Sequence, residues 1–485
     1  MNYFKRPILY IFLAALGFSC SETQLDQYPE TQLTEGNFYT NEAQIIQAVN
    51  DVYRQLNRTY AASGLVDLYG ELYSDNTYIE FSGGATTFED DIKAFRIQPN
   101  NGLIQTAWNN SYNSVYICNN AILQLEKTTV PFSNPALKDR LKAEAIFIRS
   151  LLFFNMVRVW GDIPLPLKVT TADESYTFLR EKKEVVYQQI IADLTASKAV
   201  LPASYTATDV GRVTKYAAAA VLAEVYLTIQ DKTNAAKELK EIIDSNLYSL
   251  DANKDGVVNA ADYAFNFLPN TKNSKESVLE LQFLAGQNAV NSNYQQTYTP
   301  YHWAFHLPGS TETFRGSGLN SPTPDLTNEF ETADTVRKNI SVYPGYVNLE
   351  TGAFIKYPFT QKFYDPNWRY PGQNVELIRY SDILLSYSEA TGDPTYLNQV
   401  RARVGLPGFG KTGYPAKYGT LALAIEHERR TELSFEFHRF FDLVRTGRAL
   451  TVLKEKGFNI TESKLLFPIP QAAIDVNPQI TQNAY

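Results

Sequence analysis

The chain has 485 residues and a formal net charge of −8 at pH 7. Such a length can bury a substantial core and would allow two or three domains. An acidic chain without a basic patch argues against nucleic acid or an anionic lipid surface as a partner. Aromatic residues make up 13% of the chain, mostly Tyr and Phe, which fits an extracytoplasmic protein whose rings could stack on flat ligands.

The first residues, 1–19, predict a signal peptide. A short basic stretch precedes the apolar run 8–16, which is too short to span a bilayer. The pattern resembles a bacterial lipoprotein signal in which Cys20 becomes the lipidated N-terminus. Phe18 is bulkier than the small residue usual there, so an ordinary secretory signal with a chance Cys is the alternative. With Cys20 acylated, we expect Cys118 to be a buried thiol without a disulfide.

Apolar residues recur with helical spacing in several segments that predict paired helices. The clearest pair lies within 211–250, where small residues at Ala217, Ala220 and Ala223 precede a turn at 231–234 and a second helix. This pair resembles a tetratricopeptide-type hairpin. Looser pairs are 41–56 with 105–125, 140–158 with 184–200, and 378–390 with 394–404. The irregular period predicts hairpins embedded in one mainly α body rather than a simple solenoid.

A twelve-residue loop, 251–262, has the spacing of a calcium-binding loop. Oxygen ligands would come from positions 1, 3, 5, 9 and 12 and from the backbone carbonyl at position 7, with Gly at position 6. The candidate ligands are Asp251, Asn253, Asp255, Val257, Asn259 and Asp262. Asp at the last position, as in the dockerin-type loops that this resembles, predicts a structural Ca²⁺ of modest affinity. The alternative is a solvated surface turn rich in Asp and Asn.

Two ring-rich segments, 70–88 and 291–370, predict irregular loops on a ligand-binding surface. Sugar rings have apolar faces on which Tyr and Trp can stack, while polar side chains bond the hydroxyl groups. The candidate ligand-binding residues are Tyr78, Phe81, Phe88, Tyr298, Tyr301, Trp303 and Phe314. The alternative for each ring is packing against the body. Short strands are expected at 277–283, 345–347 and 354–356, and helical structure from 376 to 390.

The segment 427–447 predicts one helix in which aromatic residues share a face and charged residues lie among them. Its spacing predicts the ion pairs Glu436–Arg439 and Asp442–Arg445. A structural ion network is favoured over a hydrolase acid–base pair, because an Arg within one turn lowers the pKa of a carboxyl group.

Several ungapped blocks resemble the SusD/RagB family over nearly all of the mature chain. They are 25–29, 160–164, 211–218, 377–390, 398–403, 428–436 and the tail 467–470. The resemblance implies a mainly α fold, with tetratricopeptide-like hairpins as a scaffold, a loop-rich ligand-binding part and a few short strands. It also implies an outer-membrane lipoprotein, facing the cell exterior, that captures a glycan and delivers it to a SusC-like TonB-dependent transporter.

The family pattern divides the mature chain into an N-terminal helical region, 20–265, and a C-terminal region, 266–485. Peptide capture for the same kind of transporter is an alternative function, and glycoside hydrolysis is a further one. We expect no enzyme and name no catalytic residue, because the sequence has no nucleophile elbow, HExxH motif, Walker loop or His/Cys cluster.

Overall fold

The computed structural model describes residues 39–80, 86–301, 305–306, 313 and 316–484. The expected signal peptide and Cys20 lie outside the described residues, as do Phe81, Trp303 and Phe314.

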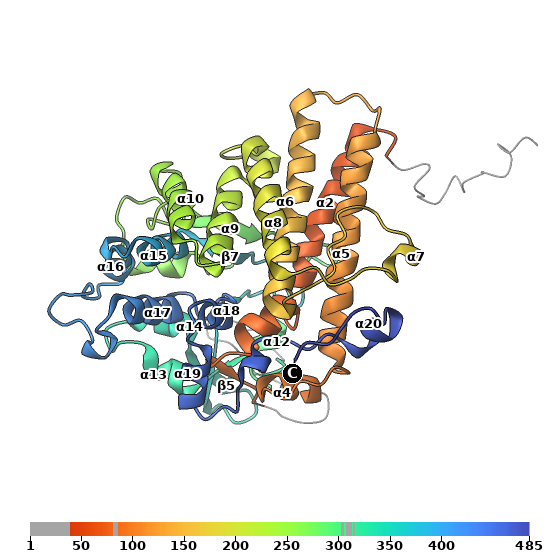
Figure 1. Ribbon diagram of the computed structural model, residues 1–485. Coiled ribbons are helices and arrows are strands. Elements are labelled where there is room, and N and C mark those ends of the chain that lie inside the picture. Colours follow the sequence, from red (N-terminus) through yellow and green to blue (C-terminus); the bar gives the residue numbers. More distant parts are fainter. Residues whose placement is uncertain (1–38, 81–85, 302–304, 307–312, 314–315, 485) are drawn as a thin grey trace, which may run out of the picture.

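A row of antiparallel helices forms one side of the molecule (Figure 1). Each helix packs against the next, and the last packs against α15 (Tyr380–Thr391). The row consists of α2 (Glu42–Thr59), α5 (Gly102–Lys127), α6 (Pro135–Trp160), α8 (Lys183–Val200), α9 (Lys215–Thr228) and α10 (Lys232–Asp244). All four predicted hairpin pairs are in contact, and the mainly α fold is confirmed.

Local sequence explains where these helices begin and how closely they pack. The side chain of Asn41 accepts a hydrogen bond from the Gln44 N–H and caps α2. Pro135 occupies the first turn of α6, where its missing N–H costs nothing. Consecutive alanines from Ala217 to Ala220 are buried in α9, which lets the neighbouring helices approach closely. Cys118 is buried in α5 as a free thiol, and burial raises its pKa to about 12.

The C-terminal half surrounds this row with shorter helices. These are α11 (Ala260–Phe265), α12 (Tyr294–Tyr298), α13 (Pro324–Glu329), α14 (Thr335–Ser341), α16 (Thr395–Arg403), α17 (Leu421–Glu432), α18 (Arg439–Arg445), α19 (Ala449–Glu455) and α20 (Gln471–Val476). Three further short helices belong to the N-terminal half: α3 (Leu65–Asp67), α4 (Thr87–Lys93) and α7 (Ala172–Ser175).

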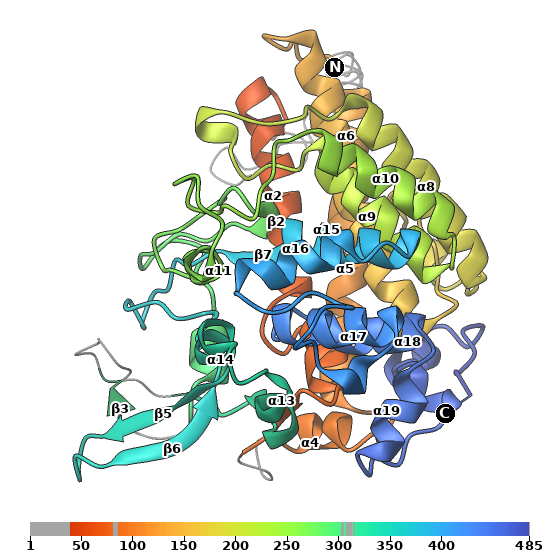
Figure 2. The same ribbon diagram turned by 90° about the vertical axis from the view of Figure 1, so that its left-hand side faces the viewer.

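Short antiparallel strands form three small sheets among the described residues. β1 (Thr77–Tyr78) pairs with β4 (Ser321–Pro322), and β2 (Ser277–Leu281) pairs with β7 (Val375–Arg379). β5 (Tyr343–Asn348) lies between β3 (Phe305–His306) and β6 (Phe354–Phe359). Figure 2 shows β5 and β6 as a hairpin at the edge of the molecule. The strands expected at 277–283, 345–347 and 354–356 are therefore confirmed.

Helical structure at 376–380 was a wrong prediction, because residues 375–379 form β7. Every residue of this strand is buried, and Glu376 lies opposite Glu280 of β2. Pairing with β2, nearly a hundred residues earlier, overrides the helical pattern that continues into α15.

The prediction of one helix over 427–447 is also wrong. The chain leaves helical geometry after α17 and re-enters it at α18, and both Phe435 (φ 65°) and Phe437 (φ 69°) are left-handed. Such a conformation costs a bulky residue about 1–2 kcal/mol. Both rings gain burial in return, and the Phe437 carbonyl oxygen packs directly onto Gly70, where a Cβ atom would lie 2.0 Å from it.

The break also places Glu436 in a buried ion network instead of beside Arg439. Glu436 accepts hydrogen bonds from Lys362 at 2.6 Å and from Arg379 at 2.8 Å, whereas Arg439 pairs with Asp75. The Glu436–Arg439 pair is therefore a wrong prediction, and the Asp442–Arg445 pair is confirmed at 2.7 Å.

Glu432 is the centre of this network. Its carboxylate accepts from Arg403 at 2.6 Å, from Arg379 at 2.9 Å and from Arg337 at 3.0 Å. Burial alone would raise its pKa, but the three guanidinium groups hold the pKa of Glu432 well below its usual range. The network joins α14, α16, α17 and β7, and it thereby fixes the C-terminal half around one set of charges.

Candidate functional site

Four tyrosines from separate parts of the chain lie together where the small sheets meet. We call Tyr78, Tyr301, Tyr346 and Tyr357 the tyrosine cluster. Antiparallel pairing of β1 with β4 sets Tyr78 opposite Ser321, and β4 in turn contacts β6, which carries Tyr357. The rings of Tyr346 and Tyr357 lie 6.3 Å apart, centroid to centroid.

Gly318 links this cluster to the chain around Tyr301. It has a left-handed backbone (φ 65°), and a Cβ atom there would lie 2.8 Å from the Tyr357 hydroxyl oxygen and 3.1 Å from the Cβ of Tyr301. Its carbonyl oxygen accepts a hydrogen bond from the Glu80 N–H at 3.3 Å. The close approach of these segments requires glycine at this position.

Exposure and charge give the cluster its chemistry. Tyr301 is 41% exposed, Tyr78 and Tyr357 are half-buried, and the Glu80 side chain is exposed beside them. Burial and the neighbouring Glu80 carboxylate raise the pKa of Tyr78, and burial raises that of Tyr357 to about 12. The Tyr357 hydroxyl oxygen is buried beneath Gly318, and the Tyr78 hydroxyl is bonded to Glu80. What a ligand can reach is the exposed ring of Tyr301, parts of the rings of Tyr78 and Tyr357, and the Glu80 carboxylate.

The structure places the predicted ligand-binding residues differently from one another. Tyr78 and Tyr301 belong to the cluster. Phe88 is 45% exposed on α4, and its ring rests against Gly102 at the start of α5. Tyr298 is only 1% exposed and donates its hydroxyl hydrogen to Asp67, so its ring belongs to the core. None of these placements tests ligand contact, which stays a prediction.

Sequence reasoning missed Tyr346, Tyr357 and Glu80. Tyr346 lies within the predicted strand 345–347, and Tyr357 directly follows the predicted strand 354–356 on the longer β6. Nothing local showed which face of the hairpin would meet β1. Glu80 follows Tyr78 by two residues, so its side chain points to the same side of an extended segment. That spacing was the one available signal.

The loop 251–262 is folded around its own side chains. The carboxylate of Asp251 accepts from the Asp255 and Gly256 N–H groups at 3.1 and 3.0 Å. The buried carboxylate of Asp262 accepts from the Asn253 and Asn259 N–H groups at 3.3 and 2.9 Å.

These contacts hold the oxygen-bearing residues in one tight turn. In the described part of the chain, no group of three or more His, Cys, Asp or Glu side chains is arranged to hold a metal ion. Calcium at 251–262 stays a prediction.

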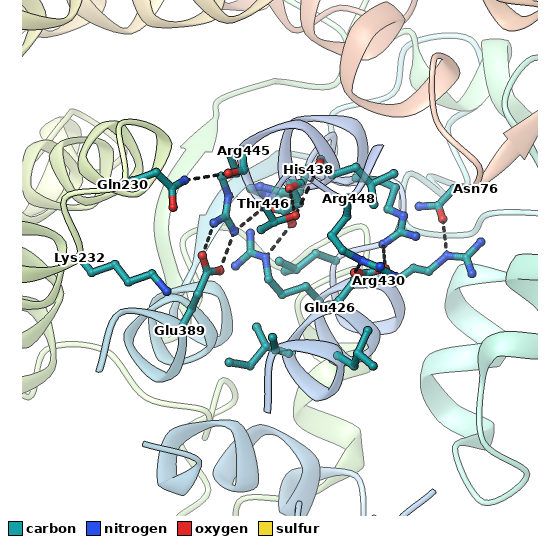
Figure 3. Close-up of a pocket in the computed structure, with 18 residues that line it drawn as sticks. Asn76, Gln230, Lys232, Glu389, Glu426, Arg430, His438, Arg445, Thr446 and Arg448 are labelled. Carbon is teal, nitrogen blue, oxygen red and sulfur yellow. Dashed lines mark hydrogen bonds and ion pairs between the residues drawn. The ribbon is translucent and has the colours of Figure 1, made fainter. Parts of the chain in front are cut away.

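A cavity of about 220 Å³ lies between α17 and α18 and is lined by several charged side chains (Figure 3). Each arginine named here already has an acidic or amide partner from this chain. Arg445 donates to Glu389 at 2.9 Å, and Arg448 donates to Glu426 at 2.8 Å. Arg430 donates to the side-chain oxygen of Asn76 at 3.0 Å.

The carboxyl group of Asp442, beside this cavity, is held in the ionised form. Burial alone would raise the pKa of Asp442, but Arg429 and Arg445 hold it well below its usual range. A general acid needs a raised pKa near the working pH. The carboxylates of the 427–447 segment are therefore structural partners of arginine, as the favoured interpretation of the sequence predicted.

The chain matches known families at both of its ends. Residues 25–227 match the family described as "Starch-binding associating with outer membrane", and residues 335–485 match the SusD family. A SusD-like protein of Bacteroides ovatus is 26% identical, over 92% of this chain and 84% of its own length. A SusD-like protein of Formosa agariphila is 24% identical, over 98% of this chain and 97% of its own.

Solved structures agree with these sequence matches. A laminarin binding SusD-like protein has a TM-score of 0.76 at 25% identity and covers 92% of this chain and 99% of its own. Surface glycan-binding protein A from Bacteroides thetaiotaomicron, in complex with laminarihexaose, has the same TM-score at 22% identity and covers 92% of this chain and 100% of its own. At that identity the second likeness concerns the fold alone.

The fold defines a class of protein in which a scaffold of helical hairpins carries a surface built from loops and short strands. The chain belongs to the SusD/RagB family, as the sequence blocks predicted. No helix among the described residues is both long and apolar enough to cross a membrane.

Proposed function

We propose that this protein is a non-catalytic subunit that binds a glycan at the cell surface. Anchored in the outer membrane through lipid on Cys20, it delivers the glycan to a SusC-like TonB-dependent transporter. The tyrosine cluster is the observation that carries this proposal. It combines the exposed ring of Tyr301 and the half-buried rings of Tyr78 and Tyr357 with the exposed carboxylate of Glu80, and such groups stack on sugar rings and bond their hydroxyls.

Two findings on other proteins support a glycan as the ligand. The first matched family is described as starch-binding, and one of the similar solved structures is named as laminarin binding. Among the described residues, Glu80 is the charged group that acts on Tyr78, Tyr346 and Tyr357. A glycan rich in acidic groups would meet this carboxylate unfavourably.

The test is retention of the full purified chain in native gels cast with separate polysaccharides, among them starch and laminarin. We expect one glycan to retard the chain and to keep its own length. Tyr301→Ala should weaken the retention by about 1–3 kcal/mol if the ring is a stacking platform. Tyr176→Ala is the matched control, because Tyr176 is 49% exposed on the short segment after α7 and lies outside the cluster.

Other results would point elsewhere. Equal loss of retention in both variants would remove the cluster from the ligand site. Shortening of the bound glycan would show an enzyme, and binding of peptides without any glycan would show the alternative capture function.

A structural calcium ion at 251–262 is a second, smaller part of this proposal. The spacing of oxygen-bearing residues supports it, with Asp251, Asn253, Asp255, Asn259, Asp262 and the Val257 carbonyl as the ligands. Neighbouring backbone N–H groups donate hydrogen bonds to several of these oxygens, so a bound ion would have to replace those hydrogen bonds.

A further inference from the structure

A second hollow, of about 450 Å³, lies where α20 packs beside the lower part of α5 (Figure 1). We call it the α5 groove. One wall is a row of side chains on α5, namely Gln105, Asn109, Tyr112 and Tyr116. Their spacing of four, three and four residues keeps them on one face of the helix. Residues of the segment 164–178 and of α20 form the other walls.

The walls of the α5 groove are fixed by buried amides. Asn119 donates to the carbonyl oxygens of Pro166 at 2.9 Å and of Lys168 at 3.0 Å, which holds that segment against α5. Asn477, after α20, donates to the Phe178 carbonyl oxygen at 2.8 Å. Both side chains are almost fully buried. The groove is therefore shaped before any ligand arrives, which lowers the entropy cost of binding.

Among the described residues, no Asp, Glu, Lys, Arg or His lines the α5 groove, although 20% of the chain is charged. The lining itself therefore offers no opposite charge to an ionic ligand, and the Arg180 side chain, which acts electrostatically on Tyr112, is bonded to the carbonyl oxygens of Asp162 and Thr481. The lining instead pairs aromatic rings with amides, and within the described part of the chain the side-chain amides of Gln105 and Asn109 make no hydrogen bond. Such amides can donate to and accept from hydroxyl groups.

The rings provide a firm platform beside those amides. Trp108 and Tyr112 lie 4.9 Å apart, centroid to centroid, and Trp160 packs edge-on behind Trp108 at 4.9 Å. The Tyr112 hydroxyl donates to the Pro164 carbonyl oxygen at 3.0 Å, which holds its ring in place. Tyr116, one turn further along, is 41% exposed and free to cover a ligand.

Phe88 lies outside the lining of the groove, against the first turn of α5. Its exposed ring rests against Gly102, one turn before Gln105 on the face that carries the row. A chain-like ligand lying along α5 would therefore meet successive rings and amides from Phe88 to Tyr116.

We propose that the α5 groove is a second saccharide-binding site, which takes uncharged sugar residues and is separate from the tyrosine cluster. This second site rests on the proposed function in one respect, namely that the ligand is a glycan. Its evidence comes from other residues: a preformed hollow, a lining without charged side chains, aromatic rings packed against one another in tilted and edge-on contacts, and two side-chain amides without a hydrogen bond among the described residues. A volume of about 450 Å³ falls within the range of small-molecule sites and is too small for a long segment of polysaccharide.

The test counts oligosaccharides bound to the full chain, purified in detergent, by native mass spectrometry. The probes are laminarihexaose, maltohexaose, cellohexaose and xylohexaose, each neutral. We expect one probe to bind with two molecules per chain. Asn109→Ala combined with Tyr116→Ala should weaken one of the two by about tenfold or more, and Tyr301→Ala should weaken the other. Tyr176→Ala, next to the groove but outside its lining, should leave both.

The outcomes separate this proposal from the proposed function. Loss of binding in Tyr301→Ala alone, with the groove variant unchanged, overturns the second site and leaves the cluster. Loss in the groove variant alone supports the second site and removes the cluster. Failure of all four probes overturns the second site. The groove variant could also bind sugar as before but no longer co-purify with a membrane protein. That result overturns the second saccharide site, because a protein segment would then occupy the groove.

Discussion

Glu71 provides the sharpest test of the electrostatics that support the ligand surface. Its side chain is fully buried below the segment that leads to β1, and the Asn76 amide donates to its carboxyl group at 3.2 Å. Burial raises the pKa of Glu71 from 4.5 to about 8. At pH 7 the folded protein therefore holds a proton on Glu71 that the unfolded chain has lost.

The sign and size of the effect follow from this difference. The folded state binds more protons than the unfolded state between pH 4.5 and 8, so the free energy of unfolding falls as the pH rises through that window. The slope for one group is about 1.4 kcal/mol per pH unit, which makes about 3 kcal/mol between pH 5 and pH 7. Glu71→Gln keeps the shape of the protonated side chain and does not titrate.

We therefore expect the free energy of unfolding of Glu71→Gln, relative to the unchanged chain, to rise by about 3 kcal/mol from pH 5 to pH 7. Urea unfolding followed by circular dichroism at pH 5, 6, 7 and 8 measures this difference. Glu455→Gln, at an exposed position on α19, is the control and should show no such trend. A difference between Glu71→Gln and the unchanged chain that stays constant over this range would refute the reasoning.

Three further predictions concern the core and the loop. Glu432→Ala leaves three buried guanidinium groups short of a partner and should lower the free energy of unfolding by about 3–5 kcal/mol in urea titration; a loss under 1 kcal/mol would contradict the network. Gly70→Ala pushes a methyl group onto the Phe437 carbonyl oxygen and should cost about 1–3 kcal/mol or more in the same assay, whereas an unchanged stability would mean that the left-handed turn can move. Calcium at a hundred times its dissociation constant should stabilise the chain by about 2.7 kcal/mol, and Asp255→Ala should abolish the shift in thermal unfolding; no shift in the unchanged chain removes calcium from 251–262.

The helical scaffold could be predicted because its signals are local. The small residues of α9, the cap at Asn41 and the apolar stripe of α2 depend on residues within a few turns of one another. Short connections also join α9 to α10 and α15 to α16, which makes these pairs neighbours. Such patterns survive without knowledge of the rest of the fold.

The break between α17 and α18 could not be predicted in this way. Its cause is a set of partners far away in sequence. The Phe437 carbonyl oxygen packs against the backbone of Gly70, and the buried Glu436 carboxylate accepts hydrogen bonds from Lys362 and Arg379. Each residue from 433 to 438 is compatible with a helix when considered alone. β7 could not be predicted for the same reason. Its apolar residues have helical spacing, but distant pairing with β2 makes the segment a strand.

The candidate site was partly predictable for a related reason. Ring density in the sequence identified Tyr78 and Tyr301, yet it gave equal weight to Tyr298, which the structure buries. Density measures how many rings are near one another along the chain. The exposure of a ring depends on whether it faces the core. The Tyr298 ring does so because its hydroxyl donates to the buried carboxyl group of Asp67.

Buried Tyr298 nevertheless contributes to the surface through a chain of hydrogen bonds. Its hydroxyl donates to Asp67, which also accepts from the Asn320 amide at 2.8 Å, and Asn320 accepts from the Thr77 hydroxyl at 2.9 Å. Thr77 precedes Tyr78, and Tyr298 precedes Tyr301 by three residues. The half-buried ring of Tyr78 and the exposed ring of Tyr301 are thus connected through a buried carboxyl group, so the core sets their spacing before a ligand binds.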